Sequence, residues 1–166
     1  MMTRRTTWMG FAAAAASLRG LLASGPAQAA QPAVVREVVH SEAEWKKLLT
    51  PAQYDVLRNA GTERPFSSPL DKEKRAGMFH CAGCALPLFS SKTKFDSRTG
   101  WPSFYQPVSR EAVDEESDRT LGFKRTEVLC HRCGGHLGHV FEDGPKPTGL
   151  RYCMNGLALA FTPGAA

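Results

Sequence analysis

The chain has 166 residues, 42% of them hydrophobic, with 15 glycines and 11 prolines. This length predicts one domain, and the composition excludes a coiled coil and a wholly disordered chain. The formal net charge of +5 raises the question of nucleic-acid binding, and the position of the charged residues answers it.

The first 29 residues have the three regions of an export signal. Arg4 and Arg5 precede an apolar stretch over residues 8–23, and Ala27-Gln28-Ala29 form a small-residue cleavage site. Removing residues 1–29 takes away three arginines and no acid, so the formal charge falls from +5 to +2. Because the remaining chain is nearly neutral, we expect no nucleic-acid partner and an exported, periplasmic protein.

The export route has more than one interpretation. Thr3-Arg4-Arg5 resembles the start of a twin-arginine signal, but Thr7 stands where such signals place a large apolar residue. The general secretory route is therefore the alternative. An uncleaved membrane anchor is a third possibility, which Arg19 disfavours because it leaves an apolar run well short of the roughly 20 residues that span a bilayer.

A linker over residues 30–40 leads to one expected domain over residues 41–162. The domain begins with a capping box of Ser41 and Glu44, which predicts a short helix. The apolar residues expected on one face of this helix are Trp45, Leu48 and Leu49.

A second helix start follows directly, with Thr50, Pro51 and Gln53 as its signal. Tyr54 and Leu57 are its expected apolar residues, and Gly61 its expected end. Residues 62–76 are rich in proline, serine and charge, and they predict an extended, exposed connection.

After Gly77 the sequence changes to short apolar runs separated by glycine and proline. Runs of this length that contain Val, Phe and Tyr predict β-strands. We expect them at residues 78–80, 86–89, 104–108, 123–129, 137–141, 150–154 and 157–161. The acidic stretch 111–118 is expected to be a solvated loop or one helical turn. The predicted fold class is therefore mainly β, with compact antiparallel sheets and short N-terminal helices.

Four of the five cysteines form two Cys-x-x-Cys pairs with 45 residues between them; the four are Cys81, Cys84, Cys130 and Cys133. Two residues between thiolates let a tight turn direct both sulfurs at one point, so two such turns supply the four ligands of a structural Zn²⁺. Gly83 and Gly134-Gly135 give these turns backbone freedom. We therefore predict a Cys₄ zinc knuckle site, closed to water and devoted to stability.

Other interpretations of the four cysteines stay open. Two disulfides are the main rival in an exported protein, and redox-active pairs are a less usual one. His80 and His131 adjoin the cysteines, so either is a possible replacement for one ligand.

Cys153 remains outside these pairs. A spare cysteine in an exported protein is a buried inert thiol, a partner for another chain or a reactive nucleophile. Arg151 would stabilise a thiolate, and His136 and His139 offer imidazoles suited to proton transfer at neutral pH. Residues three apart cannot share one face of a regular strand. Gly138 between the histidines suggests a bend that turns both rings inward.

Five stretches in chain order carry a resemblance: Cys81-x-x-Cys84, Phe95-Asp96-Ser97-x-x-Gly100-Trp101-Pro102-Ser103-Phe104, Cys130-x-x-Cys133, Gly135-His136-Leu137-Gly138-His139-Val140-Phe141 and Arg151-Tyr152-Cys153-x-Asn155. Together they resemble the methionine-R-sulfoxide reductases of the B type, from about Ser41 to Phe161. The resemblance implies an enzyme that reduces the R epimer of methionine sulfoxide in oxidised proteins or peptides. A thiolate attacks the sulfoxide sulfur, the oxygen is protonated, and the cysteine becomes a sulfenic acid.

The resemblance also implies roles for single residues. Cys153 is the nucleophile, and His139 and His136 position the sulfoxide oxygen and supply protons. Asn155 hydrogen-bonds near the nucleophile or the oxygen, and Arg151 favours the thiolate.

Trp101 would offer an indole wall for the methyl group of the substrate. Taken from the residues alone, a core tryptophan in a Trp-Pro turn is the simpler interpretation. Many family members carry a resolving cysteine at the position of Thr99. We therefore expect a one-cysteine monomer with one structural Zn²⁺, regenerated by an external thiol, either thioredoxin-like or small.

Two other functions compete with this one. The first is a zinc-ribbon binding module without catalysis, in which Cys153 is structural. The second is a thiol–disulfide oxidoreductase that uses its Cys-x-x-Cys pairs, which predicts two titratable dithiols and no tightly bound metal.

Overall fold

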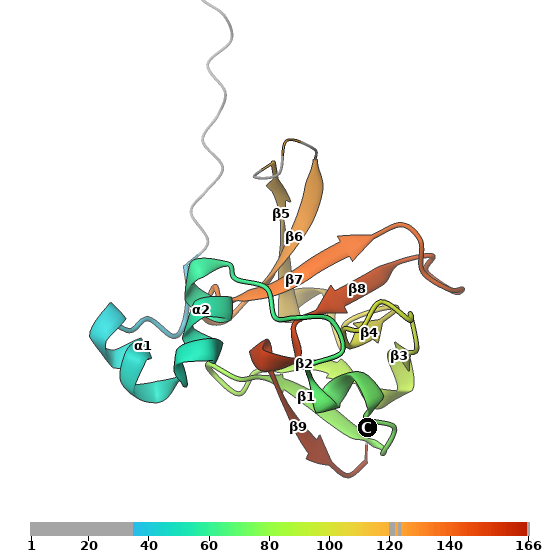
Figure 1. The fold of residues 1–166 in the computed structure, drawn as a ribbon, viewed down its shortest axis with the longest axis horizontal. Helices are drawn as coiled ribbons and strands as arrows, with labels where there is room; N and C mark the ends of the chain where they lie inside the picture. Colours follow the sequence, from blue (N-terminus) through green and yellow to red (C-terminus); the bar gives the residue numbers. More distant parts are fainter. Residues whose placement is uncertain (1–34, 120–121, 123, 166) are drawn as a thin grey trace, which may run out of the picture. The chain divides into compact units, whose positions relative to one another are not determined.

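The computed structural model describes residues 35–119, 122 and 124–165 (Figure 1). The predicted export signal over residues 1–29 lies outside these residues, as does the first part of the predicted linker. Within the described ranges, no helix has the length and apolar character needed to cross a bilayer.

Both predicted helices are confirmed. Helix α1 (Glu42–Leu48) starts at the capping box of Ser41, and α2 (Pro51–Asn59) at that of Thr50. Trp45 and Leu49 are buried as predicted, whereas Leu48 is 60% exposed and the prediction for it was wrong. Leu48 is the last residue of α1, whereas Leu49 follows it in an extended conformation, with φ −111° and ψ 147°, so the two side chains do not share one helix face.

The segment after α2 differs from its prediction in two ways. The left-handed residue that ends α2 is Ala60 at φ 53°, rather than Gly61, which donates its N–H to the carbonyl of Asp55. The connection 62–76 is not wholly exposed, since it contains a short 3₁₀ helix, η1 (Pro69–Lys72), and the buried Glu63.

Nine strands in the described part of the chain form two antiparallel sheets (Figure 1). The first sheet has the order β2-β1-β9, from β1 (Gly77–Cys81), β2 (Pro87–Ser90) and β9 (Leu159–Pro163). The second has the order β3-β4-β8-β7-β6-β5, from β3 (Lys94–Phe95), β4 (Ser103–Phe104), β5 (Val113–Asp118), β6 (Arg125–Cys130), β7 (His136–Phe141) and β8 (Arg151–Met154). The predicted fold class is therefore confirmed.

Single strands depart from the prediction. The strand expected at 104–108 is reduced to the two residues of β4, and the run 157–161 begins as a 3₁₀ helix, η4 (Gly156–Ala158), before β9. The acidic stretch 111–118, expected to be a loop or one helical turn, begins in a 3₁₀ turn, η3 (Arg110–Ala112), and continues as the edge strand β5, so the prediction was wrong for residues 113–118. Val113 is buried while Glu115 and Glu116 face solvent, and an edge strand tolerates such charges because only one side is paired.

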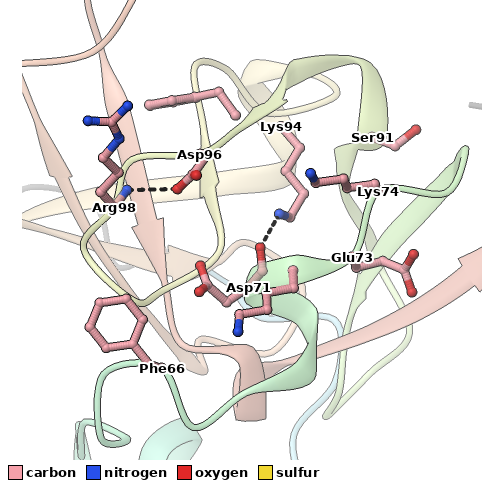
Figure 2. A pocket seen from close by; sticks show the side chains of 10 residues that line it. Phe66, Asp71, Glu73, Lys74, Ser91, Lys94, Asp96 and Arg98 are labelled. Atoms are coloured by element: carbon pink, nitrogen blue, oxygen red, sulfur yellow. Dashed lines mark hydrogen bonds between the residues drawn. The ribbon is translucent and has the colours of Figure 1, made fainter.

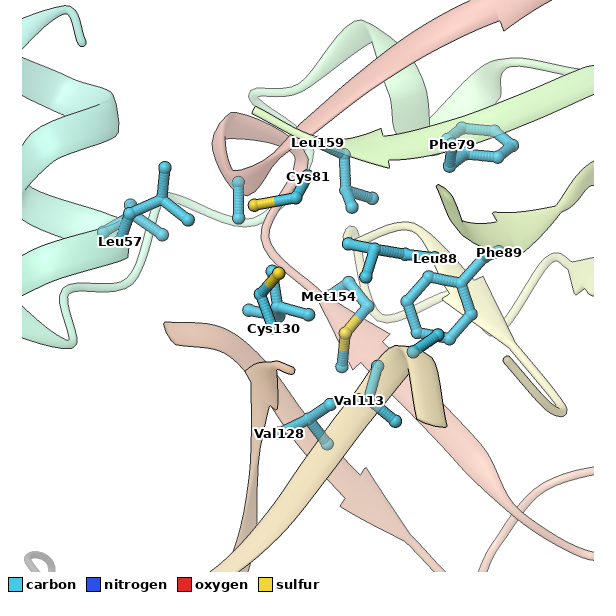
Figure 3. Packing of buried hydrophobic residues seen from close by; sticks show 14 of the residues in the cluster. Leu57, Phe79, Cys81, Leu88, Phe89, Val113, Val128, Cys130, Met154 and Leu159 are labelled. Carbon is cyan, nitrogen blue, oxygen red and sulfur yellow. The ribbon is translucent and has the colours of Figure 1, made fainter. Parts of the chain in front are cut away.

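The core lies between the sheets and is rich in aromatic rings (Figure 3). Phe104 stacks on Phe89 at 4.5 Å between ring centroids and meets the edge of Phe79 at 4.9 Å. On β8, Tyr152 and Met154 are buried in this core. Because side chains alternate along a strand, Cys153 between them faces the opposite side of the six-stranded sheet.

Candidate active site and metal centre

The two Cys-x-x-Cys turns have the same hydrogen-bond pattern. The carbonyl of Cys81 accepts the N–H of Ala85, and that of Cys130 accepts the N–H of Gly134, both at 2.8 Å. Ala85 and Gly134 are the left-handed residues, at φ 58° and 68°. The second turn uses a glycine as predicted. In the first turn the left-handed position falls on Ala85, so the prediction for Gly83 was wrong.

The four sulfurs of these turns lie within 4.8 Å of one another. Cys81 Sγ is 3.7 Å from Cys133 Sγ, and Cys84 Sγ is 3.5 Å from Cys130 Sγ. Four sulfurs at about 2.3 Å from a tetrahedral metal are about 3.8 Å apart, whereas a disulfide needs about 2.05 Å. The donor set and its spacing therefore fit one metal ion, and neither the disulfide alternative nor His80 or His131 as a ligand is needed.

Arginines surround these turns. Arg36 donates to the carbonyls of Cys130 and His131, Arg58 to that of Cys133, and Arg132 to that of Cys84. His131 itself is committed to Asp114, with Nδ1 2.9 Å from Oδ1. Four thiolates around a divalent ion would carry an excess negative charge, and positive groups beside them would reduce it. Arg36 also pairs with Asp114 and Arg132 with Glu37, which leaves Arg58 as the arginine of this set without a carboxylate partner among the ion pairs of the described residues.

Cys153 lies in the middle of the six-stranded sheet. Its cross-strand neighbours are His139 on β7 and Ser103 on β4, and the Thr99 hydroxyl is 3.8 Å from its sulfur. Burial raises the pKa of the Cys153 thiol, and this effect outweighs the opposite influence of the Thr99 hydroxyl and the Arg151 guanidinium. At neutral pH the resting group is therefore a thiol.

A small cavity of about 130 Å³ opens at Cys153. It is lined by Thr62, Trp101, Arg125, Gly138, His139, Phe141, Cys153 and Asn155. Four of the six residues predicted for the catalytic or substrate site line this cavity: Cys153, His139, Asn155 and Trp101. The other two, His136 and Arg151, do not line the cavity, but each contacts a residue that does: His139 and Phe141, respectively.

The two histidines meet because β7 carries a bulge. Val128 of β6 pairs with Gly138 and the next residue pairs with His136, so β7 has one extra residue there. One extra residue reverses the alternation of faces, which brings residues three apart to the same side. The ring centroids of His136 and His139 are 5.4 Å apart, which confirms that both rings turn inward.

Carboxylates fix the orientation of both rings. Asp118 Oδ2 lies 2.9 Å from His139 Nε2, and Glu127 Oε1 lies 2.6 Å from His136 Nδ1. Since ionised carboxylates only accept, these nitrogens carry the protons, and the opposite nitrogens are acceptors when the rings are neutral. Burial lowers the pKa of His139, although Asp118 opposes this, so His139 is neutral at pH 7.

Gly138 allows β7 to approach β8 closely. A Cβ at this position would lie 2.1 Å from the carbonyl oxygen of Cys153, which is backbone and has no room to move. Gly138→Ala is therefore expected to destabilise the fold by about 2 kcal/mol or more, as overpacking does. Urea denaturation measures this. Gly83→Ala is the matched control, because its Cβ would meet no atom closer than 3.5 Å, and an equal loss in both variants would contradict the explanation.

Arg151 makes a two-pronged ion pair with Asp143, through Nε and a terminal nitrogen, both at 2.8 Å. Its guanidinium also lies over the ring of Phe141, 4.4 Å from the centroid. These contacts with Asp143 and Phe141 fix the position of the Arg151 guanidinium near Cys153. Arg151 therefore lowers the pKa of the Cys153 thiol from a fixed place, without lining the cavity.

Glu63 connects Trp101 and Asn155, and the sequence analysis missed it. Its carbonyl accepts the indole N–H of Trp101 at 3.2 Å, and its own N–H donates to Asn155 Oδ1 at 3.1 Å. Burial raises the pKa of its carboxyl, against two backbone N–H donors, those of Gly156 and Leu157, that lower it. The Asn155 amide also donates to the carbonyl of Leu137 at 3.2 Å.

Other functional residues were missed for a common reason. Thr62 lies in the predicted exposed connection, Asp118 in the predicted acidic loop, and Glu127 and Arg125 in a strand predicted only by its apolar residues. The sequence did offer one signal for a strand here, the acidic residues that recur at every second position up to Asp118. Asp118 pairs with Arg125 across the two strands, and cross-strand pairs of opposite charge stabilise antiparallel strands.

A second cavity, of about 860 Å³, does not include Cys153 in its lining, and Figure 2 shows the residues that line it. Lys94 reaches across it to the carbonyl of Asp71, and the Arg98 N–H donates to the Asp96 carboxylate. Its lining mixes both signs of charge and contains neither a cysteine nor a histidine. It therefore has no groups for the chemistry that Cys153 and His139 offer.

Comparison with known proteins gives a consistent result. The SelR domain family matches residues 49–163, which include both cysteine turns and every residue that lines the small cavity. Three curated relatives are named peptide methionine sulfoxide reductase MsrB. The one from Leptospira interrogans is 56% identical over 125 residues, covering 75% of this chain and 95% of that protein. The relative from Agrobacterium fabrum is 54% identical over 127 residues (76% and 94%), and that from Pseudomonas putida 58% over 120 residues (72% and 90%).

Proposed function

The chain belongs to the SelR family of peptide methionine sulfoxide reductases, and we propose that Cys153 is the nucleophile with which it reduces the R epimer of methionine sulfoxide. The family match confirms the resemblance drawn from the motifs. The observation that carries the residue assignment is the cavity at Cys153, which brings a thiol, a neutral imidazole, an indole and an amide together.

The reaction uses a proton that the resting site already holds. The raised pKa of Cys153 keeps its proton on sulfur, and the sulfoxide oxygen needs one proton to leave. His139 accepts the thiol proton and passes it to the oxygen while the thiolate attacks the sulfoxide sulfur. The attack forms an S–S bond to the substrate while the protonated oxygen leaves as hydroxide. The hydroxide then attacks the Cys153 sulfur and breaks the S–S bond, so methionine departs as the thioether and Cys153 becomes a sulfenic acid.

The other residues hold the substrate and the histidine. Trp101 places an indole against the methyl group, a packing that suits sulfur-bearing methyls. Asn155 has one amide N–H engaged by the Leu137 carbonyl, and its second N–H faces the sulfoxide oxygen. Asp118 keeps the proton of His139 on Nε2, which leaves Nδ1 as the acceptor. His136 supports the ring of His139 from behind.

Regeneration comes from an outside thiol, thioredoxin-like or small. Thr99 stands closest to the sulfur in the loop where a resolving cysteine would be, and a hydroxyl cannot form a disulfide. One thiol attacks the sulfenic acid, releasing water and leaving a mixed disulfide. A second thiol then frees Cys153 and leaves as the disulfide of the reductant.

The four cysteines of the two turns would hold a structural Zn²⁺. A bound zinc ion would cross-link the two turns and stabilise the domain, and its closed Cys₄ shell would have no position for substrate. The spacing of the sulfurs and the arginines around them support this proposal.

The test supplies each epimer of a peptide methionine sulfoxide to the enzyme without reductant. We expect one methionine per enzyme from the R epimer, none from the S epimer, and Cys153 labelled by a sulfenic-acid probe. Equal yields from both epimers would contradict the assignment. No methionine at all would favour the zinc-ribbon binding module, and a protein without tightly bound metal would favour the thiol–disulfide oxidoreductase.

Thr99→Cys is expected to create an internal disulfide route. The Thr99 hydroxyl is 3.8 Å from Cys153 Sγ, so a small shift brings a sulfur there to the bonding distance of about 2.05 Å. After one turnover the variant should lose two free thiols and resist the sulfenic-acid probe, whereas the wild type loses one. Thiol titration and mass spectrometry measure this, and Ser97→Cys in the same loop is the control. A disulfide from Cys153 to a cysteine of the metal turns would refute the one-cysteine mechanism.

A further inference from the structure

All four polar atoms of Glu63 form hydrogen bonds to residues near Cys153. Its N–H and carbonyl bond to Asn155 and Trp101, and its carboxylate accepts the N–H groups of the two residues after Asn155. We propose that Glu63 is a positioning residue, which holds the Asn155 amide and the Trp101 indole in the orientation that the sulfoxide requires. This inference rests on the proposed function, because Asn155 and Trp101 matter only if the substrate binds at Cys153. Glu63 is 8% exposed and does not line the cavity itself, so it acts through its partners.

The carboxylate takes over a task that asparagine usually performs. Asn155 is the N-cap residue of η4, where an asparagine side chain ordinarily accepts a backbone N–H from its own helix. Here the Asn155 side chain makes no such bond. Glu63 accepts in its place, with Oε1 2.5 Å from the N of Gly156 and Oε2 3.1 Å from the N of Leu157.

This exchange releases the Asn155 side chain for the cavity. Its Oδ1 accepts the N–H of Glu63, and its Nδ2 donates to the carbonyl of Leu137. These two bonds fix the plane of an amide that is only 2% exposed and that lies two residues after Cys153. Because Asn155 also lines the cavity, a fixed plane would make its second amide N–H a preorganised donor there.

The backbone of Glu63 does the same for Trp101. The indole N–H donates to the Glu63 carbonyl at 3.2 Å, which sets the face that the ring presents to the cavity. One residue thus fixes the amide and the indole relative to each other.

Close packing keeps Glu63 in place. A Cβ on Gly156 would lie 1.9 Å from Ser68 Oγ and 3.2 Å from Glu63 Oε1, so only glycine lets the segment 62–68 close over the end of β8. Glu63 is therefore tightly packed and only 8% exposed, although it reaches the edge of another cavity that Ser68, Gly156 and Leu157 also line. An unsatisfied donor at this position is poorly hydrated.

Glu63→Gln tests the proposal with an isosteric side chain. The amide replaces one acceptor by a donor, which opposes a backbone N–H of η4. We expect kcat on the R sulfoxide to fall by about tenfold or more, with a smaller change in KM. The reason is that the altered side chain displaces the Glu63 backbone, whose N–H and carbonyl order Asn155 and Trp101. The rate of Cys153 alkylation by iodoacetamide should stay within about twofold, since Glu63 does not contact the thiol.

A double-mutant cycle separates positioning from stability. If Glu63 acts through Asn155, Glu63→Gln should cost about twofold or less in an Asn155→Ala background. Glu44→Gln is the matched control, because Glu44 also accepts a backbone N–H at a helix start, that of Ser41 in α1. It should keep full activity.

Three results would overturn the proposal. The first is full activity of Glu63→Gln, and the second is an activity loss from Glu63→Gln that is as large in the Asn155→Ala background as in the wild type. The third is loss of folding in both Glu63→Gln and Glu63→Asp, which would assign Glu63 to stability alone. Cys153→Ser distinguishes the two levels of inference. If that variant is active, the proposed function fails; if it is inactive while Glu63→Gln is normal, only the role of Glu63 fails.

Discussion

Cys153→Ser is expected to lose methionine sulfoxide reduction by at least about a thousandfold, because a hydroxyl is a far weaker nucleophile than a thiolate. The assay follows methionine released from the R sulfoxide with excess dithiothreitol. Serine is close in volume to cysteine, and the cross-strand neighbour of position 153 is itself a serine, Ser103. A hydroxyl is therefore compatible with this part of the sheet, and the fold should tolerate the change. Zinc content and Tm should match the wild type.

Thr99→Ser serves as the matched control, because it keeps a hydroxyl 3.8 Å from the thiol while removing a methyl group beside Cys153. It should retain most of the activity. Activity of Cys153→Ser within tenfold of the wild type would refute Cys153 as the nucleophile, and equal loss in both variants would indicate that the cavity, rather than the thiol, had been damaged.

Cys130→Ser and Cys84→Ser are expected to lose the metal and most of the stability. A structural zinc ion contributes about 10–16 kcal/mol in finger peptides, which is comparable to the whole stability of a small domain. Cys130 is fully buried, so its hydroxyl replacement cannot be hydrated in compensation. We expect Tm to fall by roughly 15 °C or more, measured by calorimetry beside zinc content by atomic absorption.

The comparison with Cys153→Ser makes this result specific. All three variants remove one thiol, yet only the two in the turns should lose metal. A chelator should lower the Tm of the wild type as these substitutions do. It should have no further effect on the Tm of Cys130→Ser, which has already lost the metal. Variants that stay stable and active without metal would show that the four cysteines serve another purpose.

Local patterns were the part of this structure that could be predicted from the sequence. The capping boxes at Ser41 and Thr50 involve residues three apart, and each cysteine turn closes within six residues, so short-range spacing was sufficient. The bulge of β7 could be inferred only as a bend, because the extra residue is defined by pairing with β6.

Long-range partners could not be predicted in this way. Asp118 orients His139 from 21 residues away, and Glu63 reaches Asn155 from 92 residues away. Both residues stand in charged segments whose composition is typical of exposed loops. Their function depends on burial by other strands, which composition does not record.

The alternation along β8 separates two oxidisable neighbours. Cys153 faces the cavity, where the proposed reaction brings an oxidised sulfur, while Met154 is fully buried on the other face. A thioether reacts with peroxides only where they reach it, and sulfoxide formation would place a polar group in the core. Met154 is thus shielded from the lesion that the enzyme repairs, although it directly follows the proposed nucleophile in the same strand.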